Sequence, residues 1–325
     1  MKKSISLITA AVIIAVTFAS CCNMTCNTKS ITPSDNIITK NISINDFQKI
    51  QLKGSLKLIY TNGERSLKIT GPDNIIPLVE TNVENGVLTI NYKNGTNIGF
   101  SRKNDLVIYA SSKSIREANL SGSGDLIIDS NINADSLSLN LWGSGDVLAI
   151  NTITCASTFN ANVSGSGDIK IATVTAKQAR VAVKGSGNID VNSITAKELH
   201  SSLAGSGDID IKEAMTTDIY NTLRGSGDIK VKAIKTNGIS SSIKGSGDIN
   251  LEGTSDSSIL TTQDSGTINA YNLLSNQVVA TVGGSGNIRC NATTTLNCNI
   301  NGSGDIYYNG IPAVTYKGKR APIKK

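Results

Sequence analysis

The sequence predicts an all-β chain that folds as a right-handed parallel β-helix (β-solenoid) of about ten rungs of about 20 residues each, behind an irregular strand-rich N-terminal cap. The first observation is a recurring Gly-Ser-Gly-Asp motif with the variants Gly-Ser-Gly-Asn and Asp-Ser-Gly-Thr. The copies start at Gly122, Gly143, Gly165, Gly185, Gly205, Gly225, Gly245, Asp264, Gly284 and Gly302. Such a period is typical of architectures in which one short unit stacks on the next.

The second observation is the alternation of apolar residues on both sides of the motif. An apolar residue stands two positions before most copies, as at Leu203 and Leu223, and isoleucine stands four positions after most, as at Ile209 and Ile229. A period of two is the period of a β-strand, so each unit is predicted to be a strand, a tight turn and a second strand. A further apolar residue nine or ten positions after the first Gly indicates a bend or a third short face. Parallel crossovers are nearly always right-handed, which favours that hand here.

The geometry of a tight turn explains why Gly and Asp or Asn recur in the motif. Glycine accepts the positive φ that a sharp turn needs, and Asp or Asn beside it can bond a backbone amide through its side chain. We therefore interpret the residue after each motif glycine pair as a turn-capping column. Its members are Asp125, Asp146, Asp168, Asn188, Asp208, Asp228, Asp248, Asn287 and Asp305.

Calcium binding is the alternative interpretation of this column. A calcium ion takes six to eight oxygen ligands, whereas the column supplies one carboxylate or amide per rung, and Asn188, Asn287 and Thr267 replace Asp where metal binding would favour a charge. The sequence therefore favours capping without a cofactor, and calcium stays the alternative.

The N-terminus has the pattern of a targeting segment. Residues 1–20 carry Lys2 and Lys3 ahead of a short apolar run, as in a signal peptide. Phe18-Ala19-Ser20-Cys21 resembles a bacterial lipobox, which predicts lipidation of Cys21; an ordinary secretory signal is the alternative. Residues 21–35, rich in Thr, Asn and Ser, are interpreted as a flexible tether. We expect an extracytoplasmic protein, lipid-anchored in the outer membrane of a Gram-negative cell, with the leaflet left open.

Three further segments follow. Residues 36–110 are strand-rich but irregular, and Gly54-Ser55 with its apolar flanks is interpreted as a degenerate first rung. A short helical turn near 74–80 and a tight turn at Glu84-Asn85-Gly86 are expected within it. Residues 111–312 are the repeats, and residues 313–325 are predicted to be a basic, solvated C-terminal tail.

Composition and motifs argue against nucleic-acid binding and against catalysis. The formal charge of +6 falls to 6 − 2 = +4 once Lys2 and Lys3 leave with the signal, too little and too scattered for nucleic acid. The single histidine, His200, has no Ser or Cys partner in a recognisable motif. A polysaccharide-active β-helix enzyme is an alternative, but such enzymes cluster their acidic residues, and here these are spread over the rungs. Cys290 and Cys298 fall at inward positions of one rung, as buried thiols or as a disulfide.

The remaining candidates are outward side chains. Trp142 and Tyr220 are expected to point outward, Tyr220 on a face next to that of Trp142, and single exposed aromatics are usually incidental. A strip of Arg180, Lys184, His200, Arg224 and Lys244 is expected on one face, where it could meet an anionic glycan or a lipid headgroup, or be a solvated face. The candidate ligand contacts are Trp142, Tyr220, Arg180, Lys184, Arg224 and Lys244.

Several separated motifs, in order, resemble one family. They are the recurrent Gly-Ser-Gly-Asp-Ile rungs, Phe47-Gln-Lys-Ile50 before Gly54, Val83-Glu-Asn-Gly86-Val-Leu-Thr-Ile90, and the lipoprotein-like signal. Together they are similar to the auto-transporter adhesin family with the head GIN domain, over about Asn45 to Pro312. The resemblance implies a β-helical extracytoplasmic protein and no established catalytic residues. We expect a non-catalytic binding or structural module of the cell envelope, an adhesin, whose ligand is an envelope, glycan or host-surface component.

Overall fold

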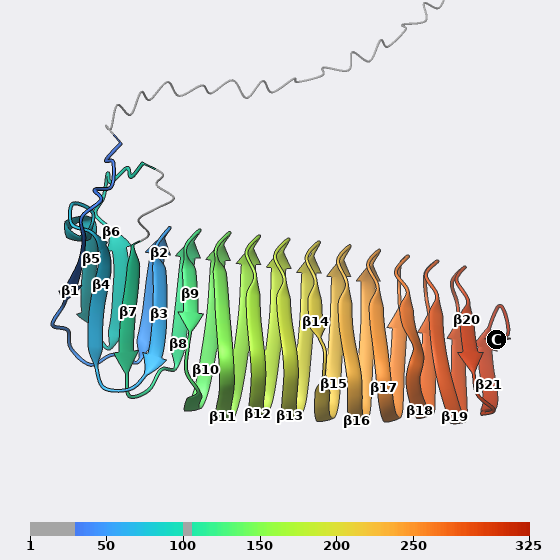
Figure 1. The fold of residues 1–325 in the computed structure, drawn as a ribbon. Coiled ribbons are helices and arrows are strands. Elements are labelled where there is room, and N and C mark those ends of the chain that lie inside the picture. Colours follow the sequence, from blue (N-terminus) through green and yellow to red (C-terminus); the bar gives the residue numbers. More distant parts are fainter. Residues whose placement is uncertain (1–29, 100–105) are drawn as a thin grey trace, which may run out of the picture.

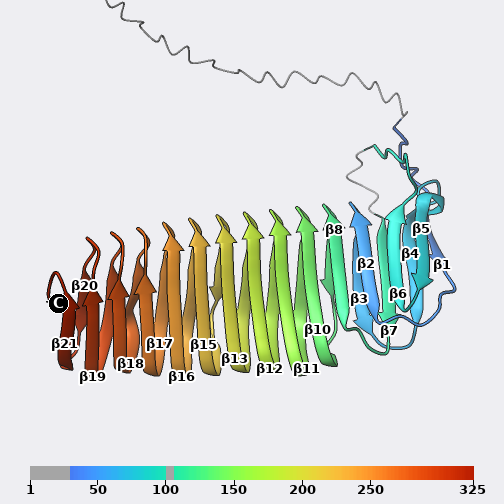
Figure 2. The ribbon, with the colours of Figure 1, turned by 180° about the vertical axis from the view of Figure 1, so that it is seen from behind.

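The protein is an elongated β-solenoid of about 10 turns, with 71% of its residues in strands and 1% in helix, which confirms the predicted fold class. The computed structural model describes residues 30–99 and 106–325. The expected signal peptide, Cys21 and residues 21–29 of the tether lie outside this range. An N-terminal cap closes one end of the stack, and the C-terminus lies at the other (Figures 1 and 2).

Each rung contains a strand before the Gly turn, a strand after it, and a corner strip that leads into the next pre-turn strand. Corresponding residues of successive rungs pair in parallel, for example Gly185 with Gly205 and Ile189 with Ile209. The strands that build the repeats are β8 (Glu117–Gly122), β9 (Asp125–Ile128), β10 (Ile132–Gly143), β11 (Asp146–Gly165), β12 (Ile169–Gly185), β13 (Ile189–Gly205), β14 (Ile209–Ile211), β15 (Ala214–Gly225), β16 (Ile229–Gly245), β17 (Ile249–Thr262), β18 (Ile268–Val282) and β19 (Ile288–Ile300). Many of these run through the corner, where the pairing shifts or skips a residue.

The core is a set of apolar columns along the axis of the stack. Ile189, Ile209 and Ile229 pair in series and are fully buried. Burying one such side chain contributes about 1.5–3 kcal/mol relative to leaving it exposed. Because no rung can cover its own inward face, the stability of each rung depends on its two neighbours.

One inward column contains polar residues in the middle of the stack. Ser201, Asn221 and Ser241 are almost fully buried and pair in series. The Asn221 Nδ2 group donates to Ser241 Oγ at 3.1 Å, while Ser201 Oγ and Asn221 Oδ1 have no partner among the described residues. These residues stand four positions before the motif glycine, so the period of two already places these polar side chains on the inward side.

The N-terminal cap contains a true rung that is placed out of chain order. β2 (Lys49–Gly54) and β3 (Lys57–Asn62) pair in parallel with β8 and β9 on one side. On the other side they pair with β6 (Val87–Tyr92) and β7 (Val107–Ser112), which come later in the sequence. The predicted first rung at Gly54 is therefore present, but it is inserted between two later segments.

Antiparallel strands close the N-terminal end. β4 (Ser66–Pro72) pairs with β7, β1 (Ile37–Asn41) pairs with β4, and β5 (Val79–Glu84) pairs with β6. The expected helical turn is a 3-10 turn, η1 (Ile76–Leu78). The expected tight turn joins β5 to β6, and Asn85 and Gly86 both have positive φ there. No helix in residues 30–99 and 106–325 is long and apolar enough to span a membrane.

The C-terminal residues, expected to be a basic, solvated tail, also form strands. After β20 (Ile306–Asn309), residues of β21 (Ala313–Gly318) pair in parallel with β19, and β22 (Ile323–Lys324) pairs with β20. The side chains of this segment are mostly exposed, as expected, but its backbone extends the ladder by a partial rung. The Gly-Ser-Gly motif is absent from this segment. Its strands pair with the exposed edges of β19 and β20 instead.

Candidate binding face

The Gly-Ser-Gly turns stack so closely that a side chain fits at neither glycine. Gly205 has φ of 156°, in the region that disfavours side chains. Gly207 has no such φ, but a Cβ there would lie 1.9 Å from the carbonyl oxygen of Gly187 in the preceding rung. The carbonyl of Gly185 accepts two bonds from the next turn, from the amides of Ser206 at 2.9 Å and Gly207 at 3.3 Å. The first glycine is required by both its φ and the stacking, because a Cβ at Gly205 would lie 2.0 Å from the carbonyl oxygen of Gly185. The second glycine is required by the stacking alone.

The Asp/Asn column bonds backbone amides of the following rung. Asn188 Oδ1 accepts from the Asp208 amide at 2.8 Å, and Asp208 Oδ1 accepts from the Asp228 amide at 2.8 Å. Asp146, Asp168, Asp228, Asp248 and Asn287 make the same bond to the next member of the column. These side chains supply acceptors where the backbone ladder bends through the turn, and they join rungs rather than close their own turn.

The two ends of the column differ from its middle. At the N-terminal end the Asp125 and Asp146 amides donate to backbone carbonyls, those of Leu56 and Gly124. At the C-terminal end Asp305 forms an ion pair with Arg320 Nη1 at 2.9 Å. Arg320 Nη2 also donates to the carbonyls of Ser303 and Gly304. Arg320 therefore closes the last turn, a role that the basic composition of the segment did not reveal.

The acidic column shows no metal-type cluster. In residues 30–99 and 106–325 there is no group of three or more His, Cys, Asp or Glu side chains arranged to hold a metal ion. In most rungs the Oδ1 atom of the column residue already accepts a backbone N–H bond.

The outward side of the pre-turn strands, which we call the pre-turn face, collects the candidate contact residues. The ladder pairs Trp142, Ser164, Lys184, Ala204, Arg224 and Lys244 in series. A second outward column, four residues earlier in each strand, pairs Asn160, Arg180, His200 and Tyr220. Residues four apart in a strand point to the same side of the sheet. The expected strip therefore lies on one face, and Tyr220 shares that face with Trp142 instead of occupying a neighbouring one.

The cations of this face are exposed and unpaired. Arg180, Lys184, Arg224 and Lys244 are exposed, and among the described residues none of them forms an ion pair. Arg180 interacts electrostatically with Glu198 without forming an ion pair. Exposed cations that form no ion pair keep their charge available to an incoming anion.

Two aromatic features complete the face. Trp142 is 46% exposed and Tyr220 is 42% exposed. The rings of His200 and Tyr220 stack with centroids 4.7 Å apart and an interplanar angle of 15°. His200 Nε2 lies 3.3 Å from a Glu198 carboxylate oxygen, and Gln178 donates to that oxygen at 2.7 Å. These bonds hold the pKa of Glu198 below its ordinary value, with the Gln178 bond as the largest cause. His200 and Tyr220 are separated by one full repeat in the sequence, and this spacing is the feature that could have predicted the stack.

Between the two columns lies a third outward column of short polar side chains. At its start it is an asparagine ladder: Asn140 Nδ2 donates to Asn119 Oδ1 and Asn162 Nδ2 donates to Asn140 Oδ1, both at 2.8 Å. It continues through Ala182, Ser202 and Thr222. Because these side chains are short, the longer residues on either side stand above them.

The outward side of the post-turn strands contains a different charge pattern. Lys170, Asp190, Asp210 and Lys230 pair in series, and the sequence alternation predicts a solvated charged face for them. Burial raises the pKa of the Asp190 carboxyl, with Asp168 and Asp210 adding to the rise and Lys170 opposing it. The Asp210 Oδ1 atom is buried without a partner among the described residues. The two carboxylates are thus less solvated than the alternation predicts.

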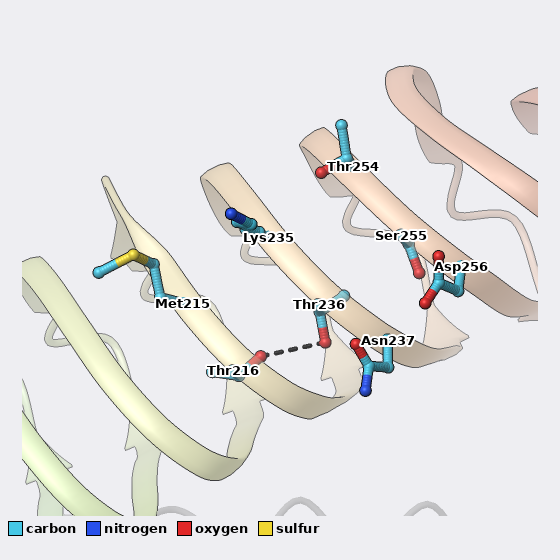
Figure 3. A pocket seen from close by; sticks show the side chains of 8 residues that line it. All are labelled: Met215, Thr216, Lys235, Thr236, Asn237, Thr254, Ser255 and Asp256. Carbon is cyan, nitrogen blue, oxygen red and sulfur yellow. Dashed lines mark hydrogen bonds between the residues drawn. The ribbon is translucent and has the colours of Figure 1, made fainter.

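A depression of about 480 Å³ lies on the corner strip (Figure 3). Its hydroxyls bond within the protein: Thr216 Oγ1 donates to Thr236 Oγ1 at 3.1 Å, and Thr236 Oγ1 donates to the carbonyls of Thr217 and Gly238. Lys235 and Asp256 lie well apart on β16 and β17 (Figure 3). The lining therefore offers no convergent set of free polar groups.

The inward cysteines are free thiols. Cys155, Cys290 and Cys298 are buried and unbridged. Burial raises the pKa of Cys155 to about 11 and those of Cys290 and Cys298 to about 12, and Cys298 adds to the rise at Cys290. Thiols with such pKa values stay protonated and unreactive near neutral pH.

Comparison with known structures gives similar chains at low sequence identity. A "putative adhesin" from Parabacteroides merdae ATCC 43184 is 22% identical, with 91% of this chain and 99% of that chain covered and a TM-score of 0.41. A "putative lipid binding protein" from Parabacteroides distasonis ATCC 8503 is 24% identical, with 91% and 100% covered and a TM-score of 0.38. A "putative adhesin" from the same strain is 22% identical, with 91% and 97% covered and a TM-score of 0.40. A search of curated proteins gave no match.

A family model matches most of the chain. It is described as "Putative auto-transporter adhesin, head GIN domain", and it matches residues 46–232 and again residues 209–312. The matched range contains the inserted rung of the cap, every Gly-Ser-Gly turn and the whole pre-turn face from Asn119 to Asn299. The chain belongs to this auto-transporter adhesin family with the head GIN domain.

Proposed function

We propose that the protein is a lipoprotein of the cell envelope, acylated at Cys21 and held in the outer membrane, that acts as a non-catalytic binding module of the adhesin type. The observation that carries the binding role is the pre-turn face. It presents exposed Trp142 and Tyr220 together with unpaired Arg180, Lys184 and Arg224 on one rigid sheet. Membership of an adhesin family supports the same role.

The non-catalytic part of the proposal rests on where the acidic residues lie. A glycoside hydrolase needs two carboxyl groups facing one substrate, about 5–10 Å apart in a cleft. In the described chain most turn aspartates bond backbone amides of the next rung, one per rung along the stack. This distribution follows the repeat and supports a structural role for these carboxylates.

The anchoring part is tested by metabolic labelling of the full-length chain in the producing bacterium with a palmitate analogue. Wild-type protein should be labelled and should fractionate with membranes. Cys21→Ala should lose the label and leave the membrane fraction, whereas the adjacent control Cys22→Ala should keep both. Equal labelling of wild type and Cys21→Ala contradicts acylation at this residue.

The binding part is tested with the mature protein on an array of envelope and host glycans, with released soluble product measured in parallel. We expect retention of some glycan without cleavage, and weaker retention for Trp142→Ala than for Trp142→Phe. Glycan cleavage by the wild-type protein contradicts the non-catalytic assignment, and retention that is unchanged in both variants contradicts the assigned face.

A further inference from the structure

We infer that the pre-turn face binds a linear anionic polysaccharide that lies along the solenoid axis, across successive rungs. This inference rests on the proposed binding function and names the class of its ligand. The structural basis is a column of outward side chains in which long residues recur every second rung from Trp142 to Arg224.

The period appears in the outward column next to the Gly turn. Long side chains alternate with short ones over five rungs: Trp142, then Ser164, then Lys184, then Ala204, then Arg224. Lys244, on the next rung, follows Arg224 directly and ends the alternation. Adjacent strands lie about 4.8 Å apart, so two rungs span about 10 Å. This spacing is close to the length of a disaccharide unit in an extended polysaccharide. A polymer with one acidic group per disaccharide can therefore meet Lys184 and Arg224 in the same register.

The charge of the face selects an anion. Lys184, Arg224 and Lys244 share one column with no carboxylate, and Arg180 stands in the second column. Two carboxylates stand at the far margin of the face. Glu198 is bonded by Gln178 and His200 and interacts electrostatically with Arg180, and Asp218 is its partner in the ladder. Among the described residues, neither carboxylate forms an ion pair with Lys184, Arg224 or Lys244.

The surface between the columns suits sugar rings. Ala182, Ser202 and Thr222 form a low strip flanked by Arg180 and Lys184 on one rung and by Tyr220 and Arg224 on another. Short hydroxyl side chains can bond sugar hydroxyls, and exposed aromatic rings give flat apolar surfaces with a polar edge. The chain supplies such rings at Trp142 and at the His200–Tyr220 stack.

The test measures binding of the mature protein to hyaluronan, chondroitin sulfate and heparin oligosaccharides of increasing length by titration calorimetry. Dextran is the neutral control, and vesicles containing phosphatidylglycerol provide the same charge on a membrane. We expect at least one anionic polysaccharide to bind and dextran not to bind. Affinity should rise with length until the oligosaccharide spans the six rungs from Trp142 to Lys244, which are about 24 Å from first to last, and then level off.

Two double variants distinguish binding at the pre-turn face from binding elsewhere on the surface. Lys184→Ala/Arg224→Ala should weaken binding about tenfold, or about 1.4 kcal/mol. Lys170→Ala/Lys232→Ala removes the same charge from exposed positions on the post-turn side and should leave Kd unchanged. Circular dichroism confirms that both variants stay folded.

Three outcomes overturn the inference. They are no binding to any of the three anionic polysaccharides, equal weakening by both double variants, and tighter binding to anionic vesicles than to every polysaccharide. Retention of a neutral glycan that depends on Trp142 but not on Lys184 and Arg224 overturns the anionic ligand and leaves the proposed binding function standing.

Discussion

At the scale of the residue, glycine and aspartate in the repeated motif act through the neighbouring rung. A Cβ added at Gly227 would lie only 1.8 Å from the carbonyl oxygen of Gly207. The Asp208 carboxylate bonds the Asp228 amide at 2.8 Å. The sequence pattern located both residue types, but it could not show that their partners lie one full repeat away, because a motif read along the chain carries no information about its spatial neighbours.

Gly227→Ala tests the close approach. The added methyl group would overlap backbone atoms that cannot move without breaking the ladder, so we expect a loss of more than about 3 kcal/mol in the free energy of unfolding in urea. Gly63→Ala is the control because a Cβ there meets nothing within 4 Å, and it should change stability by less than about 1 kcal/mol. Equal stability of Gly227→Ala and wild type would refute the stacked-turn geometry.

Asp190 makes the stability of the molecule depend on pH with a known sign. Burial raises its pKa in the folded state above the ordinary value, so the native protein holds this proton more tightly than the unfolded chain does. Stability from this group is therefore lost as the pH rises through the raised pKa. Asp190→Asn should be more stable than wild type at pH 7, and the difference should shrink as the pH falls toward the ordinary Asp range near about 4.

Denaturant melts between about pH 3 and pH 7 measure this difference, on either side of the ordinary Asp range. Asp135→Asn, at an exposed position, controls for the change in net charge. A lower stability of Asp190→Asn than of wild type at pH 7 would show that the folded protein stabilises the ionised carboxylate, which is opposite to the effect expected of burial.

At the scale of the element, the strands fall into two groups of different predictability. The repeats β10 to β19 follow from the period of two around each glycine turn, and the structure contains the parallel ladder that this period predicts. The cap does not follow from the pattern, because the rung of β2 and β3 pairs with β6 and β7 from later in the chain. The partial rung of β21 and β22 was missed because it lacks the motif and binds to an existing strand edge.

The Asp/Asn column is an inter-strand element, and its contribution can be measured. Asp208→Ala removes the acceptor of the Asp228 amide and should cost about 1–3 kcal/mol of unfolding free energy, the usual cost of leaving a polar group without its bond. Asp208→Asn should retain most of the stability, because Asn188 makes the same bond to the Asp208 amide at 2.8 Å.

Thermal melts of the same three proteins with calcium and then with chelator separate capping from metal binding. Capping predicts melting temperatures that do not depend on calcium. A calcium-dependent rise of more than about 10 °C in wild type, absent from Asp208→Ala, would identify the column as a metal site.

At the scale of the whole molecule, the chain is a one-dimensional stack with a cap at the N-terminal end and Arg320 closing the last turn. The fold class could be predicted from the motif period, and the residues of the candidate face could be placed outward from their offset to each glycine. Their grouping into columns needed the pairing register, because rungs of slightly different length and shifts at the corner decide which side chains become neighbours. The unpaired state of the cations also depends on this register.

The central claim is that the rungs stack in register as one rigid array, since the binding face exists only if they do. Spin labels on Ser144→Cys and Ser285→Cys, both at exposed turn positions, measure it directly by pulsed electron resonance. Cys21, Cys22 and Cys26 are replaced by Ser in this protein, and the thiols of Cys155, Cys290 and Cys298 are buried away from the label. The two positions are seven rungs apart along the stack, so we predict one narrow distance distribution centred near about 34 Å. A broad distribution, or a mean that differs from this by more than about 8 Å, would contradict stacking in register.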